Sequence, residues 1–254
     1  MKKIFKLLKS PILTNLLLIS GLCIFLMLIF LERDRITNKL SPNYTLAKEQ
    51  SINKKFSKEI LDGGYILFFR HAERYKAEPF QQLQVYDAYE VNNNLKGENT
   101  YFAKFVCLNE LGKIQAKMIG QVINQLNVKF SKVISSTSCR SRQTAELAFN
   151  RIDETYNSLV HQGPWSEPKE IFFKNVREIL LKNKPQKGEN IFIVAHNSVI
   201  KKPVFDEVFD NGIDYFLQEG GFYLIENRNE KLYLVHKFRT FLDFSSSLYK
   251  RPQD

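Results

Sequence analysis

Three short runs of apolar, β-branched and aromatic residues recur along the chain, at residues 65–69, 132–136 and 191–195. Runs of this length and composition are typical of buried strands. Elsewhere, apolar residues return every three or four positions, a spacing that predicts helices over residues 108–126, 140–149 and 168–182. The chain therefore alternates between the periods of strands and helices.

Two late apolar stretches, 221–226 and 231–237, are separated by four polar residues and predict a hairpin. Alternating strands and helices followed by a hairpin indicate an α/β protein. The fold class we expect is a three-layer α/β/α sandwich with the hairpin at an edge of the sheet. The stretch between Arg74 and Cys107 fits neither period, and we interpret it as a lid or binding loop, or alternatively as a surface excursion.

The amino-terminal part has a different composition. Residues 11–31 contain no charged residue, and 21 such residues are long enough to cross a bilayer as a helix. A cleaved signal peptide is the alternative, but charged Glu32 and Arg33 follow the apolar run instead of a small-residue cleavage site. We expect a signal anchor preceded by a basic cytoplasmic tail (1–10) and followed by a linker (32–60) and one domain (61–254).

The orientation of this anchor is set only weakly by its flanks, which are both basic. The tail is short and the large domain lies downstream, so we favour a single-pass membrane protein with an extracytoplasmic domain. The net charge of +10 is concentrated near the anchor: residues 1–59 hold eleven Lys/Arg and four Asp/Glu, a balance of +7 that leaves +3 for the remainder. Without a basic run or a nucleic-acid motif in the domain, we expect no nucleic-acid partner.

Two cysteines lie outside the anchor segment, Cys107 and Cys139. An extracytoplasmic location permits them to form a disulfide. Two buried free thiols are the alternative. No cluster of residues has the spacing of a metal site, and we expect no metal and no cofactor.

Each of the three central runs ends next to a cationic or titratable side chain. Arg70 and His71 follow the first run, Arg140 follows the second, and His196 follows the third. Ligands of α/β proteins bind at the carboxyl ends of the strands, where these side chains would meet. Two arginines can hold an oxyanion, and a neutral histidine can act as a base or a nucleophile.

The residues around these positions resemble the signatures of the histidine phosphatase superfamily, in its phosphoglycerate mutase-like branch. The similar segments follow the family order: Arg70-His71-Ala72-Glu73, Leu108-Asn109-Glu110-Leu111-Gly112 with Gln115-Ala116, Ser135-Ser136 with Arg140 and Gln143-Thr144-Ala145, and Val194-Ala195-His196-Asn197. The resemblance covers roughly residues 61–237. It implies that His71 is the nucleophile and forms a phosphohistidine, and that Arg70, Arg140 and His196 line the phosphate pocket, with Glu73 as a further substrate-binding residue.

Three positions depart from the family pattern or qualify it. Ala72 stands where the family has glycine. Arg74 is similar to an arginine in the signature of the acid phosphatase branch of the superfamily. That branch is expected to have aspartate after the second histidine, however, and Asn197 in this position favours the smaller, phosphoglycerate mutase-like branch. Arg142 is expected to face outward from its helix, and His161 and His236 are expected to be ordinary surface or packing histidines.

A leaving alkoxide needs a proton, and the donor is left open by the sequence. The carboxylic acids that we consider are Glu73, Glu78, Asp87, Glu90, Glu167, Glu170 and Glu219. The function we predict is hydrolysis of a phosphomonoester by a membrane-anchored, metal-independent phosphatase that acts on a phosphorylated small molecule or envelope component. A pseudoenzyme that binds a phosphorylated ligand is the alternative, and a phosphomutase is disfavoured.

Overall fold

The computed structural model describes residues 42–75, 87, 106–161, 167–210 and 212–248. The chain divides into two compact units, residues 1–52 and 53–254. The first unit is described only from the start of helix α3 (Pro42–Asp62), whose later residues belong to the second unit. The predicted tail, the predicted anchor at 11–31 and the first part of the predicted linker lie outside the described residues. Among the helices that are described, none combines the length and the apolar character needed to cross a membrane.

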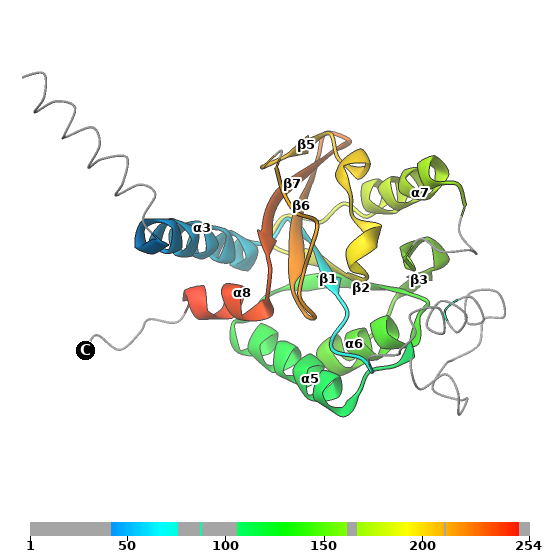
Figure 1. Ribbon diagram of the computed structural model, residues 1–254, viewed down its shortest axis with the longest axis horizontal. Coiled ribbons are helices and arrows are strands. Elements are labelled where there is room, and N and C mark those ends of the chain that lie inside the picture. Colours follow the sequence, from blue (N-terminus) through cyan, green and yellow to red (C-terminus); the bar gives the residue numbers. More distant parts are fainter. Residues whose placement is uncertain (1–41, 76–86, 88–105, 162–166, 211, 249–254) are drawn as a thin grey trace, which may run out of the picture. The chain divides into compact units, whose positions relative to one another are not determined.

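A seven-stranded sheet forms the centre of the second unit (Figure 1), with the strand order β3-β2-β4-β1-β6-β7-β5. Its strands are β1 (Ile66–Arg70), β2 (Phe130–Ser136), β3 (Glu154–Tyr156), β4 (Asn190–Ala195), β5 (Glu207–Val208), β6 (Phe222–Arg228) and β7 (Lys231–Phe238). β3, β2, β4 and β1 run parallel to one another, whereas β6 is antiparallel to β1 and to β7. The parallel strands therefore present four carboxyl ends at one edge of the sheet.

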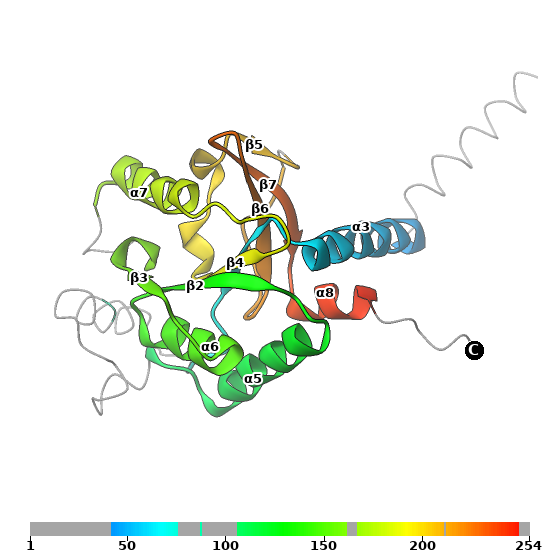
Figure 2. The same cartoon turned by 180° about the vertical axis from the view of Figure 1, so that it is seen from behind.

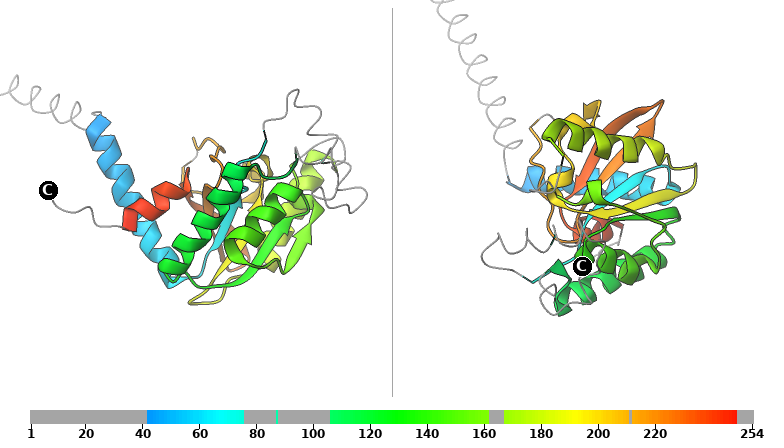
Figure 3. Two further views of the ribbon diagram at one scale, coloured as in Figure 1. Left: turned by 90° about the horizontal axis from the view of Figure 1, so that it is seen from below. Right: turned by 90° about the vertical axis from the view of Figure 1, so that its right-hand side faces the viewer.

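Helices cover both faces of this sheet, with α7 on one side and α5 and α6 on the other (Figures 1 and 2). α5 and α6 lie side by side (Figure 3). Within the described residues of the second unit, the helices that follow α3 are α5 (Glu110–Gln125), α6 (Cys139–Phe149), α7 (Lys169–Lys182) and α8 (Phe241–Leu248), with short 3₁₀ helices η3 (Asn157–Leu159), η4 (Asn197–Val199) and η5 (Lys202–Val204). The mixed α/β architecture predicted from the sequence is confirmed.

The alternation of side chains along β1 explains why the sheet needs both helical layers. Ile66 and Phe68 pack with α7, while Leu67 and Phe69 pack with α5 and α6, and all four are buried. Burial of each such side chain contributes about 1.5–3 kcal/mol. A continuous apolar run in a parallel strand is what burial on both faces requires, and it fixes β1 at the centre of the sheet.

The predicted hairpin is present as β6 and β7. Its connection is shorter than expected, because the strands extend to Arg228 and Lys231 and leave a two-residue turn. The turn residues Asn229 and Glu230 have positive φ values of 51° and 59°, as type I′ hairpin turns require. The hairpin does not end the sheet, since the short strand β5 pairs with β7.

Candidate active site

The carboxyl ends of β1, β2 and β4 bring together the four residues that the resemblance singled out. Arg70 pairs in register with Ala195, so His71 and His196 leave their strands at the same level. The backbone N–H of His71 donates to the carbonyl of Ala195 at 3.0 Å. The two imidazole rings lie 5.1 Å apart between centroids, and each residue is 4 % exposed.

The ring of His71 is held with one nitrogen directed into the site. Its Nδ1 lies 2.7 Å from the carbonyl oxygen of Ala72, so Nδ1 carries the proton and donates it. Nε2 then has a free lone pair, which accepts a hydrogen bond from Nε of Arg140 at 3.2 Å. This tautomer leaves Nε2 as the nucleophilic atom.

Arg140 lies in the first turn of α6 and is 1 % exposed. Its guanidinium has two edges that can each donate two parallel hydrogen bonds. The edge formed by Nε and Nη2 faces the two imidazoles, with Nη2 at 3.3 Å from Nδ1 of His196. A single cationic edge therefore spans both histidines, which is the arrangement that an oxyanion bound between them would need.

Serine hydroxyls orient the second histidine. Nε2 of His196 lies 3.1 Å from Oγ of Ser136 and 3.2 Å from Oγ of Ser138. Since Nδ1 accepts from Arg140, Nε2 carries the proton and donates to these hydroxyls. Ser136 ends β2 and Ser138 precedes α6, so the loop between strand and helix sets the orientation of His196.

Arg70 is fixed by the segment before β6. Its Nη1 donates to the carbonyl oxygen of Leu217 at 2.5 Å, and its Nη2 forms an ion pair with Glu219. Asn197 holds the same segment, because its side-chain amide both donates to and accepts from the backbone of Leu217, at 2.8 and 2.7 Å. Asn197 thus positions the carbonyl of Leu217 that accepts from Arg70.

Several motif residues support the site without entering it. Gln115 accepts from the backbone of Glu73 at 2.9 Å and donates to the backbone of Glu219 at 2.8 Å. Thr144 accepts from the N–H of Ala72 at 2.9 Å. Gly112 must be glycine, because a Cβ atom there would lie 1.8 Å from the carbonyl oxygen of Glu73.

The possible proton donors are dispersed. The carboxylate of Glu73 accepts from Asn109 at 3.0 Å, at the cap of α5, so its predicted part in substrate binding stays a prediction. Glu219 is paired with Arg70 and Asp87 with Arg140. Glu167 and Glu170 are exposed near the start of α7, and Glu78 and Glu90 lie outside the described residues.

Two further residues belong to this cluster: Asp87, which the sequence analysis considered only as a proton donor, and His161, which it did not assign to the site. His161, expected to be an ordinary surface or packing histidine, lies with its ring centroid 5.5 Å from that of His196, and its Nε2 is 2.8 Å from Oδ2 of Asp87. It follows β3 and η3, and β3 is parallel to β2, so His161 reaches the same edge of the sheet. The sequence did not indicate this position, because β3 lacks the apolar run that marks β1, β2 and β4.

The disulfide considered from the sequence is present between Cys107 and Cys139, whose Cα atoms lie 4.8 Å apart. Cys139 immediately precedes Arg140 and opens α6. The carbonyl oxygen of Val106, next to Cys107, accepts from Nη1 of Arg140 at 3.4 Å. The crosslink therefore ties the residue before Arg140 to the segment whose carbonyl accepts from this arginine.

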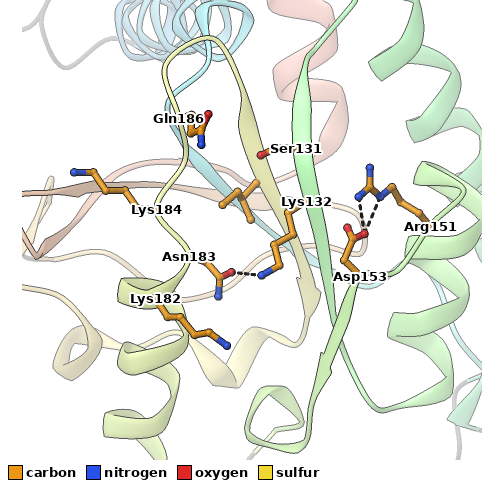
Figure 4. Close-up of a pocket in the computed structure, with 9 residues that line it drawn as sticks. Ser131, Lys132, Arg151, Asp153, Lys182, Asn183, Lys184 and Gln186 are labelled. Atoms are coloured by element: carbon orange, nitrogen blue, oxygen red, sulfur yellow. Dashed lines mark hydrogen bonds and ion pairs between the residues drawn. The ribbon is translucent and has the colours of Figure 1, made fainter.

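A separate cavity of about 400 Å³ lies at the opposite end of the sheet (Figure 4). Lys132, near the start of β2, bonds Glu154 and Asn183 there, and Arg151 is paired with Asp153. Lys182 and Lys184 also line this cavity, so cations outnumber carboxylates there, but none of Arg70, His71, Arg140 and His196 belongs to it.

The buried histidines make the stability of the chain depend on pH. Burial, followed by the charges of Arg140 and Arg70, lowers the pKa of His71 well below its usual value of 6.5. Burial and the charge of Arg140 act in the same way on the pKa of His196, and burial lowers the pKa of His236 to about 4. Below pH 6.5 the unfolded chain takes up protons that the folded chain resists.

We therefore expect the folded state to lose stability as the pH falls from 6.5 towards these lowered pKa values, and to keep it above pH 6.5. The melting temperature should be lower at about pH 5 than at about pH 7.5, with each pKa unit of difference costing roughly 1.4 kcal/mol per group. A variant His236→Gln should show a smaller decrease. An equal or higher melting temperature at the lower pH would show that these histidines are protonated in the folded chain.

Comparison with curated proteins gives short matches to phosphatases. No protein-family model matches the chain. The serine/threonine-protein phosphatase Pgam5 of Drosophila virilis, a mitochondrial protein, is 39% identical over 54 residues, which are 21% of this chain and 19% of that protein. The corresponding protein of Drosophila willistoni is 46% identical over 46 residues, 18% of this chain and 16% of that protein. The chain thus matches less than a fifth of the length of these curated relatives.

Among solved structures, the protein histidine phosphatase SixA complexed with tungstate has a TM-score of 0.43 and 10% identity, covering 68% of this chain and 96% of that one. A phosphoserine phosphatase variant from Entamoeba histolytica in complex with phosphoserine has a TM-score of 0.43 and 16% identity, covering 73% and 99%. The chain resembles histidine phosphatases, as its motifs predicted.

Proposed function

We propose that the chain is a phosphatase with a phosphoglycerate mutase-like domain that hydrolyses a phosphomonoester through a phosphohistidine at His71. The observation that carries this proposal is the state of His71: a buried, neutral imidazole whose free Nε2 faces the edge of Arg140. A neutral ring nitrogen held in one orientation is an activated nucleophile. A side chain that only bound phosphate would not need that orientation.

The reaction follows from the positions of these groups. Nε2 of His71 attacks phosphorus, a P–N bond forms, the P–O bond to the leaving group breaks, and the leaving oxygen takes a proton. Arg140, Arg70 and His196 supply donors to the oxygens that carry the charge during transfer. Water then attacks phosphorus and releases one proton, which replaces the proton taken up by the leaving oxygen, the P–N bond breaks, and inorganic phosphate leaves with His71 restored.

Arrangement at the membrane is part of the proposal. The uncharged run at 11–31 would anchor the chain as a single-pass protein, with the phosphatase domain on the extracytoplasmic side. A disulfide beside Arg140 supports an oxidising compartment. The substrate class that suits this placement is a phosphorylated small molecule or envelope component.

The test is to detect the covalent intermediate. The full chain, solubilised and treated with a chelator, is mixed with an aryl phosphate, quenched in base and digested for mass spectrometry. We expect phosphate on His71, stable to base and lost in acid, and steady release of the phenol. His236→Gln, which alters a buried histidine outside the site, should behave like the parent chain. Phosphate on another residue, dependence on metal, or oxyanion binding without turnover would contradict the proposal.

A further inference from the structure

The carboxylate of Asp87 lies at the back of the site, against the guanidinium of Arg140. Its Oδ1 accepts from Nη1 at 2.7 Å and its Oδ2 accepts from Nη2 at 3.0 Å. Asp87 has no exposed surface and Arg140 is 1 % exposed. This is a two-point ion pair shielded from water, the strongest form of contact between an arginine and a carboxylate.

The edge of the guanidinium that Asp87 occupies is not the edge that faces the histidines. Asp87 takes Nη1 and Nη2, whereas Nε and the second hydrogen of Nη2 are directed to His71 and His196. A phosphoryl group between the two imidazoles can therefore use the Nε/Nη2 edge while Asp87 keeps the other. The carboxylate and the phosphoryl group do not have to compete for the same hydrogens.

His161 is a second residue that holds Asp87, in addition to Arg140. Its Nε2 donates to Oδ2 of Asp87 at 2.8 Å, so Asp87 is held by a cation on one side and an imidazole on the other. A long arginine side chain loses conformational entropy when it is fixed in one rotamer. Contacts that fix it before the substrate binds remove this loss of entropy from the catalytic step. The contacts of Asp87 and His161 supply this fixation.

We propose that Asp87 and His161 are positioning residues, which hold Arg140 with its Nε/Nη2 edge aimed at the phosphoryl group on His71. This inference rests on the proposed function. It adds two residues to the set that the family resemblance implies.

The charge state of Asp87 excludes it as the proton donor to the leaving group, a role that the sequence left open. Burial alone would raise the pKa of its carboxyl, but the charge of Arg140 and the hydrogen bonds from His161 and Arg140 outweigh burial and lower it below the usual range. The carboxylate is thus ionised at neutral pH and has no proton to give. Asp87 is therefore not the general acid.

The rival interpretation is that Asp87 blocks the site by occupying Arg140 in place of phosphate. The two interpretations predict opposite signs for the same substitution. Asp87→Asn keeps the size of the side chain but loses its charge. It weakens oxyanion binding if Asp87 positions the arginine, and it strengthens oxyanion binding if Asp87 blocks it.

The experiment compares the full chain with Asp87→Asn, His161→Gln and the double variant, using an aryl phosphate for kinetics and tungstate as the oxyanion probe. Asp206→Asn is the matched control, because Asp206 also pairs with an arginine, Arg177 at 2.8 Å, outside the site. We expect Asp87→Asn to lower kcat/KM about 10- to 100-fold, mainly through KM, and to weaken tungstate binding by a similar factor. The control should match the parent chain.

His161→Gln, which keeps a donor, should lose less, and the double variant should be no worse than Asp87→Asn, since residues that act as a unit are not additive. If Asp87→Asn does not fold, a KM change in His161→Gln with an unchanged melting temperature tests the same chain of contacts. Unchanged kinetics, or tighter tungstate binding in Asp87→Asn, would overturn the inference while leaving the phosphatase assignment intact. A parent chain that neither hydrolyses the aryl phosphate nor binds tungstate would overturn both.

Discussion

His71→Ala should abolish hydrolysis of an aryl phosphate, lowering kcat by at least about four orders of magnitude. The substitution removes the only ring nitrogen that accepts from Nε of Arg140 among the described contacts. It leaves Arg70, Arg140 and His196 in place, so tungstate should still bind, within roughly tenfold of the parent affinity. The measurement is steady-state kinetics beside a binding titration.

The two readouts separate loss of the nucleophile from loss of the pocket. His236→Gln is the control, because His236 is buried between Phe56 and Phe238 and bonds Asn53 instead of any site residue. Equal loss of turnover and of tungstate binding in His71→Ala would show a collapsed site. Retained turnover would remove His71 from the mechanism.

Arg140→Lys should also have a large effect, on activity and on stability together. A lysine carries the charge but cannot span both imidazoles with one planar edge or grip Asp87 at two points. We expect kcat/KM to fall about 10²- to 10³-fold, the range seen when one donor to a developing charge is lost. Arg140→Ala, which leaves the buried carboxylate of Asp87 without its arginine partner, should lower the free energy of unfolding by about 3–5 kcal/mol.

The stability part is measured by urea unfolding. Arg177→Ala serves as the control, since Arg177 and Asp206 form a partly exposed pair, with side chains 27% and 31% exposed. Such pairs contribute at most about 1 kcal/mol. If Arg140→Ala unfolds at the same urea concentration as the parent chain, the pair with Asp87 is not buried in solution.

The sequence predicted five of the seven strands, and the four residues that follow the central ones, because an apolar run marks each of those five; β3 and β5 are short and lack such a run. Arg70, His71 and His196 lie at such ends, and the parallel arrangement brings them together. Asp87 and His161 come from stretches without an apolar period, and no local pattern relates two residues 74 positions apart. Their proximity is a property of the folded chain.

Arg142 shows a different limit of prediction from the sequence. Its spacing from Arg140 predicts an outward direction, yet it is 9% exposed and its Nε donates to the carbonyl of Thr137 at 3.0 Å. Because Arg142 lies in the first turn of α6, its side chain can turn back to the loop that precedes the helix. The expectation was wrong because helical periodicity does not describe contacts beyond a helix end.

The central position of β1 has a consequence for how the chain folds. β1 pairs with β4 and with β6, and the bond between Tyr65 and Asn190 joins residues 125 positions apart. Contacts between such distant residues form slowly, because a long loop must close before they contribute. His71 and His196 follow these two strands, so the two histidines can meet only after residues 71–196 have been synthesised and β1 has paired with β4. A growing chain that ends before β4 lacks His196 and cannot form the proposed phosphate pocket.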